Sequence, residues 1–231
     1  MSYQYVAVAG ARIAYRASGS GPALVLMKNN RRPLEYPVAD ALSQRFRVLQ
    51  IHPVGFGASD RPAEYDFGSI GQQVLAVLDH ERIDRFAIWG FSQPACMSAV
   101  VARSTDRAAA LVMGGVPPIG FPTDGTMRRM EREPRLPKAA LEFWRSYRSY
   151  DWHHELRCYA GRKVAYMGTA DPAIRPFRKL RPVLQGIGFT YLEFDGLSHA
   201  SCGLGDESAD GRRVAQTVAD LLLSRGAAVA E

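Results

Sequence analysis

Cysteine is scarce in this sequence, and its three cysteines are widely spaced. Cys96, Cys158 and Cys202 form no C-x-x-C pair, and no histidine-rich metal pattern accompanies them. This spacing excludes a disulfide framework and gives no sign of a metal site. A reducing cytoplasm is therefore the expected compartment.

Long apolar runs and a basic leader are also missing. No stretch approaches the roughly 20 apolar residues that a membrane span needs. The first ten residues (MSYQYVAVAG) hold neither a basic start nor a long apolar run, so we expect no secretory signal. Only four of the 29 basic residues are lysine, and the arginines are spread along the chain. The net charge of +6 therefore predicts a solvated surface, with neither a nucleic acid nor a membrane as partner.

The apolar content that is present suits one globular domain spanning residues 1–231. The chain is 47% hydrophobic and 23% charged, which argues against wholesale disorder. Apolar runs alternate with amphipathic segments, and this alternation predicts an α/β fold: a mostly parallel sheet with helices on both faces. The expected strands are 3–9 and 12–17 (a hairpin), 23–27, 46–51, one from Phe86 to a Gly-x-Ser turn, 109–113, 162–167 and 190–194. The expected helices are 33–44, 69–81, one from that turn to about Arg103, 172–184 and 207–224.

Residues 116–161 interrupt this alternation. No clear strand lies there, and the stretch is rich in arginine and aromatic residues. Two short helices are expected, Asp124–Glu133 and Pro137–Tyr150. We interpret the stretch as a short helical lid inserted in the domain, because open α/β sheets bind ligands at the carboxyl ends of their strands.

One short motif carries the first chemical signal. An apolar run ends in Gly90-Phe91-Ser92-Gln93-Pro94, and a helix-compatible segment follows at once. This is the layout of a nucleophile elbow, in which a sharp turn exposes a serine hydroxyl and leaves the next N–H, that of Gln93, free to bind an oxyanion. Pro94 replaces the second glycine of G-x-S-x-G, and a proline is acceptable in the first turn of a helix. An ordinary helix N-cap is the alternative role for Ser92.

Two later residues supply the partners that a serine nucleophile needs. Asp171 follows one expected strand, and His199 lies in the loop after the last strand. A histidine can take the serine proton, and a carboxylate can orient the histidine. The order Ser, Asp, His therefore predicts a catalytic triad of Ser92, Asp171 and His199. Asp195 is the alternative acid, a helix cap is the alternative role for Asp171, and a surface position is the alternative for His199.

These segments together make the chain resemble the α/β-hydrolases along nearly its whole length. The strand 24–27, the Gly55-x-Gly57-x-Ser59-Asp60 loop, the elbow, the Gly168-Thr169-Ala170-Asp171 segment and the late histidine all fall in the family's order. The resemblance implies an α/β-hydrolase fold with Ser92 as nucleophile, His199 as general base and Asp171 as the acid that orients it. It implies no metal and no organic cofactor.

The sequence departs from the family's pattern at the end of the third strand. The family usually has His-Gly there, and the residue after that pair donates the second N–H to the oxyanion. Here the segment reads Lys28-Asn29-Asn30, so by position Asn30 is the expected donor, with Asn29 and Lys28 as neighbouring substrate-binding candidates. Arg31 and Arg32 add positive charge, which hints at a substrate with a carboxylate or phosphate. A solvated loop is the alternative interpretation.

The pattern as a whole favours a serine hydrolase of a small-molecule ester, thioester, lactone or amide. Ser92 would attack the carbonyl, and water would release the acyl group. Two other functions stay open: a non-hydrolytic reaction on the same triad (acyl transfer, C–C cleavage, elimination or cyclisation), and a small-molecule binder or receptor. A monomer and a homodimer are equally compatible with the sequence.

Overall fold

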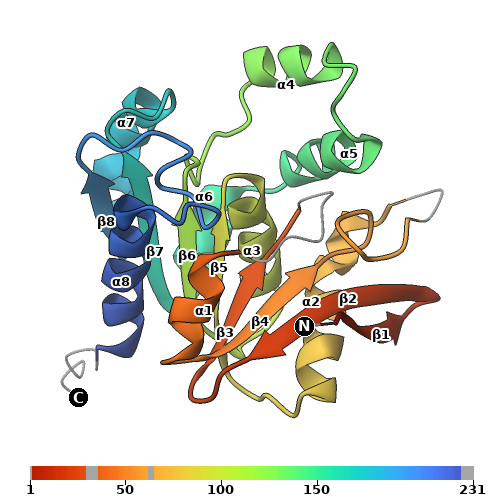
Figure 1. Cartoon of the computed structure of the whole chain (residues 1–231). Helices are drawn as coiled ribbons and strands as arrows, with labels where there is room; N and C mark the ends of the chain where they lie inside the picture. Colours follow the sequence, from red (N-terminus) through yellow and green to blue (C-terminus); the bar gives the residue numbers. More distant parts are fainter. Residues whose placement is uncertain (1, 30–35, 62–64, 225–231) are drawn as a thin grey trace.

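The protein, seen in a computed structural model that describes residues 2–29, 36–61 and 65–224, is built on an eight-stranded sheet (Figure 1). The strand order is β1-β2-β4-β3-β5-β6-β7-β8. β1 and β2 pair antiparallel, β2 also pairs antiparallel with β4, and the remaining pairs are parallel. The mostly parallel sheet is thus confirmed. The strands are β1 (Gln4–Val8), β2 (Ala11–Ser18), β3 (Ala23–Met27), β4 (Arg47–His52), β5 (Phe86–Phe91), β6 (Ala108–Gly114), β7 (Arg162–Gly168) and β8 (Phe189–Phe194).

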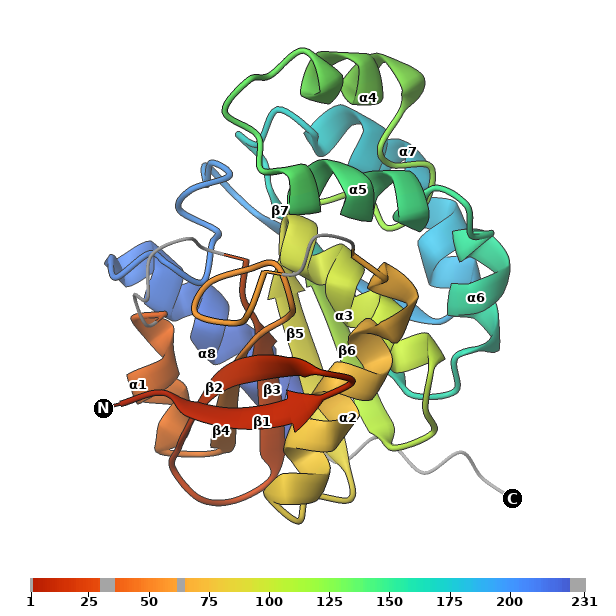
Figure 2. The same ribbon diagram turned by 90° about the vertical axis from the view of Figure 1, so that its right-hand side faces the viewer.

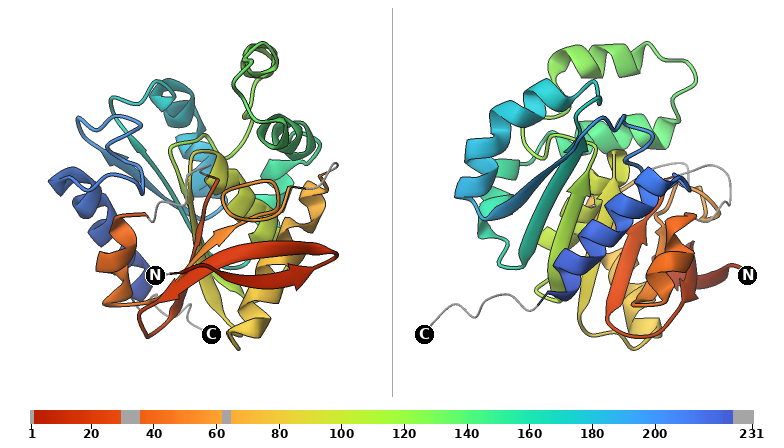
Figure 3. Two further views of the ribbon diagram at one scale, coloured as in Figure 1. Left: turned by 45° about the vertical axis from the view of Figure 1, so that its right-hand side comes forward. Right: turned by 60° about the vertical axis from the view of Figure 1, so that its left-hand side comes forward.

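Helices cover both faces of this sheet. α1 and α8 lie side by side on one face (Figure 3, right), and α2, α3 and α7 contribute to the apolar core on the other. Within the described part of the chain, no helix combines the length and the apolar character needed to cross a membrane. The helices are α1 (Val38–Ser43), the short 3-10 helix η1 (Phe67–Ser69), α2 (Ile70–His80), α3 (Gln93–Arg103), α4 (Asp124–Glu131), α5 (Lys138–Tyr147), α6 (Trp152–Cys158), α7 (Ile174–Gly186) and α8 (Ala209–Leu223).

The two-sided cover explains why the central strands are apolar throughout. Every residue of β3 is buried, whereas β1 at the edge of the sheet is largely exposed. A strand covered on both faces needs apolar side chains at consecutive positions rather than in alternation. The helices begin and end near the expected residues except at α1, which begins at Val38 after Pro37, while residues 33–35 of the expected helix lie outside the described residues.

Three helices, rather than the two expected, lie between β6 and β7. α4 and α5 stand beyond the carboxyl ends of the parallel strands, and α6 leads back towards β7 (Figure 2). The aromatic side chains of this segment pack on one another: the Tyr147 and Trp152 rings stack with centroids 4.2 Å apart, and the Trp152 indole N–H donates to the Tyr147 carbonyl. Those rings therefore build the core of the segment.

His52, at the end of β4, is a fully buried histidine. Its Nδ1 accepts a hydrogen bond from the Ala58 backbone N–H at 3.2 Å, so the neutral ring carries its proton on Nε2. Burial lowers the pKa of His52 to about 3, and the charges of Lys28 and Arg16 add to this effect. Protonation would place a charge in the core and displace the Ala58 N–H.

This histidine should make the protein sensitive to acid. Unfolded His52 binds a proton below its ordinary pKa of 6.5, whereas the folded ring binds one only near pH 3. The unfolded state therefore holds more protons in this window, and the free energy of unfolding falls by about 2 kcal/mol between pH 6.5 and 4.5. We expect His52→Asn, whose Oδ1 can still accept from Ala58, to flatten that pH dependence. Urea titrations across this range test it, with exposed His80→Asn as the matched control. Equal slopes in the wild type and His52→Asn would contradict it.

Candidate active site

The turn between β5 and α3 has the backbone of a nucleophile elbow. Ser92 has φ 61° and ψ −131°, a region that residues with a Cβ rarely adopt, and its N–H donates to the Gly114 carbonyl at 2.8 Å. A Cβ on Gly90 would lie 2.1 Å from the Pro94 carbonyl oxygen, so only glycine lets the first turn of α3 cross this strand. Pro94 occupies the first turn of the helix, where its missing N–H costs nothing.

The Ser92 hydroxyl does not cap the helix that follows it. Ser92 occupies the N-cap position of α3, yet its side chain accepts no capping hydrogen bond. A strained backbone of this kind costs of the order of 1–3 kcal/mol and is typical of functional sites. An N-cap role therefore accounts neither for the strained backbone of Ser92 nor for the presence of a hydroxyl group at this position.

Asp171 and His199 come together as the sequence predicts. His199 Nδ1 lies 2.6 Å from Asp171 Oδ2, and the Asp171 side chain is only 2% exposed whereas that of His199 is 43% exposed. The other carboxylate oxygen of Asp171 accepts the Ala173 N–H at 2.8 Å. Asp171 thus holds the histidine and also the turn that leads into α7. The alternative acid, Asp195, is exposed and accepts instead from the Thr169 hydroxyl.

The histidine lies beside the serine turn. The His199 ring packs on the ring of Phe91, the residue directly before Ser92, with centroids 4.8 Å apart. The hydrogen bonds among the described residues include none between Ser92 Oγ and His199. Such contacts are often long before a substrate binds. The turn, the histidine and the carboxylate therefore share one site at the carboxyl ends of β5, β7 and β8.

Gln93 links three parts of this site through its side chain. Its Oε1 accepts from Asn29 Nδ2 at 3.0 Å, and its Nε2 donates to the Ala140 carbonyl in α5 at 3.1 Å. The residue after Ser92 thus ties the end of β3 to the α4–α6 segment, while its backbone N–H begins α3 at the positive end of the helix dipole. Sequence reasoning assigned only the backbone N–H of Gln93 to the site.

Lys28 lies apart from these groups. Its side chain is buried, 3.4 Å from Gln50 Oε1 and over the Tyr36 ring. Burial lowers the pKa of this amine to about 8. Asn29 stays at the site through Gln93, whereas Asn30, the expected second oxyanion donor, lies outside the described residues together with Arg31 and Arg32.

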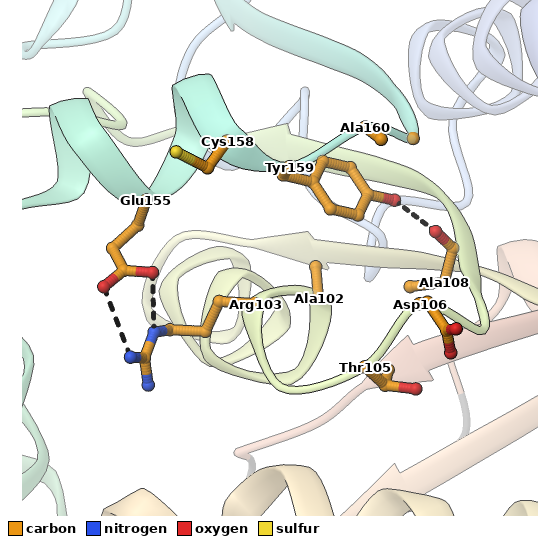
Figure 4. A pocket seen from close by; sticks show the side chains of 10 residues that line it. Ala102, Arg103, Thr105, Asp106, Ala108, Glu155, Cys158, Tyr159 and Ala160 are labelled. Carbon is orange, nitrogen blue, oxygen red and sulfur yellow. Dashed lines mark hydrogen bonds and ion pairs between the residues drawn. The ribbon is translucent and has the colours of Figure 1, made fainter.

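A cavity of about 290 Å³ elsewhere in the molecule is remote from this chemistry (Figure 4). It lies at the end of α3, about 16 Å of helix away from Ser92, and its Arg103 and Glu155 pair with each other at 3.1 Å. Within residues 2–29, 36–61 and 65–224 no cluster of three His, Cys, Asp or Glu side chains could hold a metal ion. The candidate site is therefore the one around Ser92.

The sheet order, the strained serine turn and the late aspartate–histidine pair define the α/β fold typical of hydrolases. A family model described as the alpha/beta hydrolase fold matches residues 28–133. An uncharacterized protein of Mycobacterium tuberculosis is 36% identical over 86 residues, which cover 35% of this chain. The match spans about a quarter of the length of that relative.

Solved structures match over nearly the whole chain. They include E-2-(acetamidomethylene)succinate hydrolase (TM-score 0.75, 15% identity, 96% of this chain and 99% of that one). They also include the enol-lactonase of Burkholderia xenovorans (0.69, 24%, 96% and 100%) and the N-formylmaleamic acid deformylase of Pseudomonas putida (0.71, 15%, 93% and 100%). At these identities the likeness shows the fold. Together with the family model over residues 28–133, it shows that the protein has the α/β-hydrolase fold.

Proposed function

We propose that the protein is a serine hydrolase that cleaves a small-molecule ester, thioester, lactone or amide through Ser92, His199 and Asp171. The observation that carries this proposal is the 2.6 Å contact between His199 and the buried Asp171, beside a serine held in a strained turn. A carboxylate in that position fixes the imidazole with its Nδ1 protonated, so Nε2 is free to act as a base.

The reaction proceeds in two halves. His199 Nε2 takes the Ser92 hydroxyl proton as Oγ attacks the substrate carbonyl carbon, and the carbonyl oxygen becomes an oxyanion. The Gln93 N–H, at the start of α3, donates to that oxyanion. The imidazolium then protonates the leaving group, which leaves an acyl-enzyme on Ser92. Water gives its proton to His199, attacks the acyl carbon and releases the acid, and Oγ regains the proton.

The α4–α6 segment acts as the lid of this site. Its α5 helix is joined to Gln93 through the Ala140 carbonyl, directly beside Ser92. A substrate that enters between the strand ends and α5 is therefore bounded by the segment that the sequence marks as an insertion. Two of the similar structures carry a carboxylic acid in their names, as succinate and maleamic acid, which agrees with an acidic substrate.

Labelling with a fluorophosphonate probe tests the proposal. The probe phosphonylates an activated serine, so we expect wild type to label at Ser92 and Ser92→Ala to stay unlabelled. Ser98, whose hydroxyl is buried in α3, provides the matched control, because Ser98→Ala should label like wild type. Equal labelling of wild type and Ser92→Ala would show that this mechanism is wrong.

A further inference from the structure

A second, smaller cavity adjoins the proposed site. It measures about 140 Å³ and is lined by Asn29, the loop after β4, and the first residues of α5. Asn29 is hydrogen-bonded to the Gln93 side chain, and Ala139 of the lining precedes Ala140, which accepts from the same glutamine. Asn29, at the end of β3, thus lines the cavity and also bonds to Gln93, the residue that follows Ser92.

A glycine lets two walls of this cavity approach each other closely. Gly55 has φ +88°, and a Cβ there would lie 2.5 Å from the Tyr65 ring and 2.9 Å from the Ala139 Cβ. The loop after β4 and the start of α5 therefore pack against each other at Gly55, and residues from both segments line the cavity. The loop is closed by a hydrogen bond from the Gly55 N–H to the Asp60 carbonyl. Its walls are set by packed backbone as well as by side chains.

The lining carries positive charge. Arg61 and Lys138 both line the cavity, and no carboxylate is among its described lining residues. Lys138 lies 3.6 Å from Glu142, which offsets part of its charge. Asp60, the acid next to Arg61 in the chain, is already bound by Arg12 through two side-chain contacts at 3.1 and 3.4 Å. Arg61 therefore keeps its charge available to the cavity.

Two further features reinforce that charge. Arg61 is oriented by its hydrogen bond to the Gly57 carbonyl at 2.8 Å, which uses one of the five N–H groups of its guanidinium. The positive end of α5 also faces the cavity, and Pro137 at its N-cap supplies no side-chain cap to the first N–H groups. An anion in this space would meet the Arg61 guanidinium and the N-terminal end of α5.

We propose that this cavity binds a carboxylate of the substrate through Arg61, so that the enzyme prefers small acyl compounds bearing a second acid group. The inference rests on the proposed function, because it places the carboxylate a few bonds from the carbonyl that Ser92 attacks. A volume of about 140 Å³ has room for four or five waters, hence for a carboxylate and two or three methylene groups but not for a long acyl chain. The planar arginine fork matches a carboxylate in two parallel hydrogen bonds. Phe56 and Tyr65 line the remaining wall.

Paired substrates test this assignment. The mono-p-nitrophenyl ester of succinate carries the second carboxylate, and p-nitrophenyl butyrate has the same acyl length without it. We expect Arg61→Met to lower kcat/KM for the succinate ester about 10- to 100-fold more than for butyrate, mainly through KM. Arg129→Met, which removes an exposed arginine of α4, should change neither value. Equal losses on the two esters in Arg61→Met would overturn the proposal. Circular dichroism confirms folding, and Arg61→Lys replaces the methionine variant if that variant does not fold.

A binding measurement separates this proposal from the proposed function. Calorimetry with Ser92→Ala measures succinate binding without any chemistry, and adding Arg61→Met should weaken that binding by a similar factor. Unchanged succinate binding would overturn the carboxylate site. Inorganic phosphate that binds more tightly than succinate, and that depends on Arg61, would overturn the choice of a carboxylate. Succinate binding that depends on Arg61, together with an unlabelled wild-type Ser92, would support the cavity assignment and refute the hydrolase alone.

Discussion

Replacing Asp171 by asparagine should lower kcat/KM about a thousandfold to ten-thousandfold while the fold stays intact. Asp171 Oδ1 accepts the Ala173 N–H, and an asparagine will keep its amide oxygen there. Its amide nitrogen then faces His199, where Oδ2 now lies 2.6 Å from Nδ1. The nitrogen donates rather than accepts, so the imidazole must carry its proton on Nε2. In that tautomer His199 cannot take the proton of Ser92.

The matched control is the acid that competes with Asp171 in the sequence. Asp195 also follows a strand of this sheet, but its carboxylate accepts from the Thr169 hydroxyl at 3.1 Å and is exposed. We expect Asp195→Asn to stay within about threefold of wild type, as surface substitutions usually have small effects. Steady-state turnover of one p-nitrophenyl ester measures both variants. A larger loss in Asp195→Asn than in Asp171→Asn would show that the acid is misassigned.

The sequence predicts the sheet and the triad because both depend on local order. Each of the three proposed triad residues follows a strand, and the carboxyl ends of parallel strands meet at one edge of a sheet. The elbow is also a local pattern: Gly90 is required by contact with Pro94, four residues later. Ser92, Asp171 and His199 could therefore be proposed without knowing any distance between them.

Contacts between distant segments could not be predicted in this way. The Gln93 side chain bonds to Asn29 and to Ala140, which lie 64 and 47 residues away. The cavity at Arg61 combines the end of β3, the loop after β4 and the start of α5. No periodicity relates these positions, because the packing of segments far apart in the chain brings them together.

Two features that we did not expect, the burial of Lys28 and the separate α6 helix, do have signals in the sequence. Lys28 continues the alternation of Leu24 and Leu26, which face the α1 and α8 side of the sheet, so its burial on that face follows the strand period. The α6 helix was not expected as a separate element. Its signal is Asp151, whose carboxylate accepts the His153 and His154 N–H groups as an N-cap.

Replacing Ser92 by glycine should lower the activity of the protein and raise its stability. Ser92→Gly and Ser92→Ala should both lower kcat by about 10⁴- to 10⁶-fold, because each lacks the nucleophile. Their stabilities should differ. Glycine adopts φ 61° and ψ −131° without strain, whereas serine and alanine both carry a Cβ into that region.

The expected gain is modest but measurable. Relief of about 1–3 kcal/mol of strain is partly offset by the 0.5–1 kcal/mol that glycine loses in chain entropy. A net gain near 1 kcal/mol raises Tm by about 2–4 °C in a chain of this size. Thermal unfolding of the wild type, Ser92→Gly and Ser92→Ala tests this expected gain. A Ser92→Gly variant that is less stable than Ser92→Ala would contradict the strained geometry. A serine that strains its backbone and caps no helix gains nothing structural from its hydroxyl, whereas the proposed attack on a carbonyl carbon needs both the exposed turn and the hydroxyl.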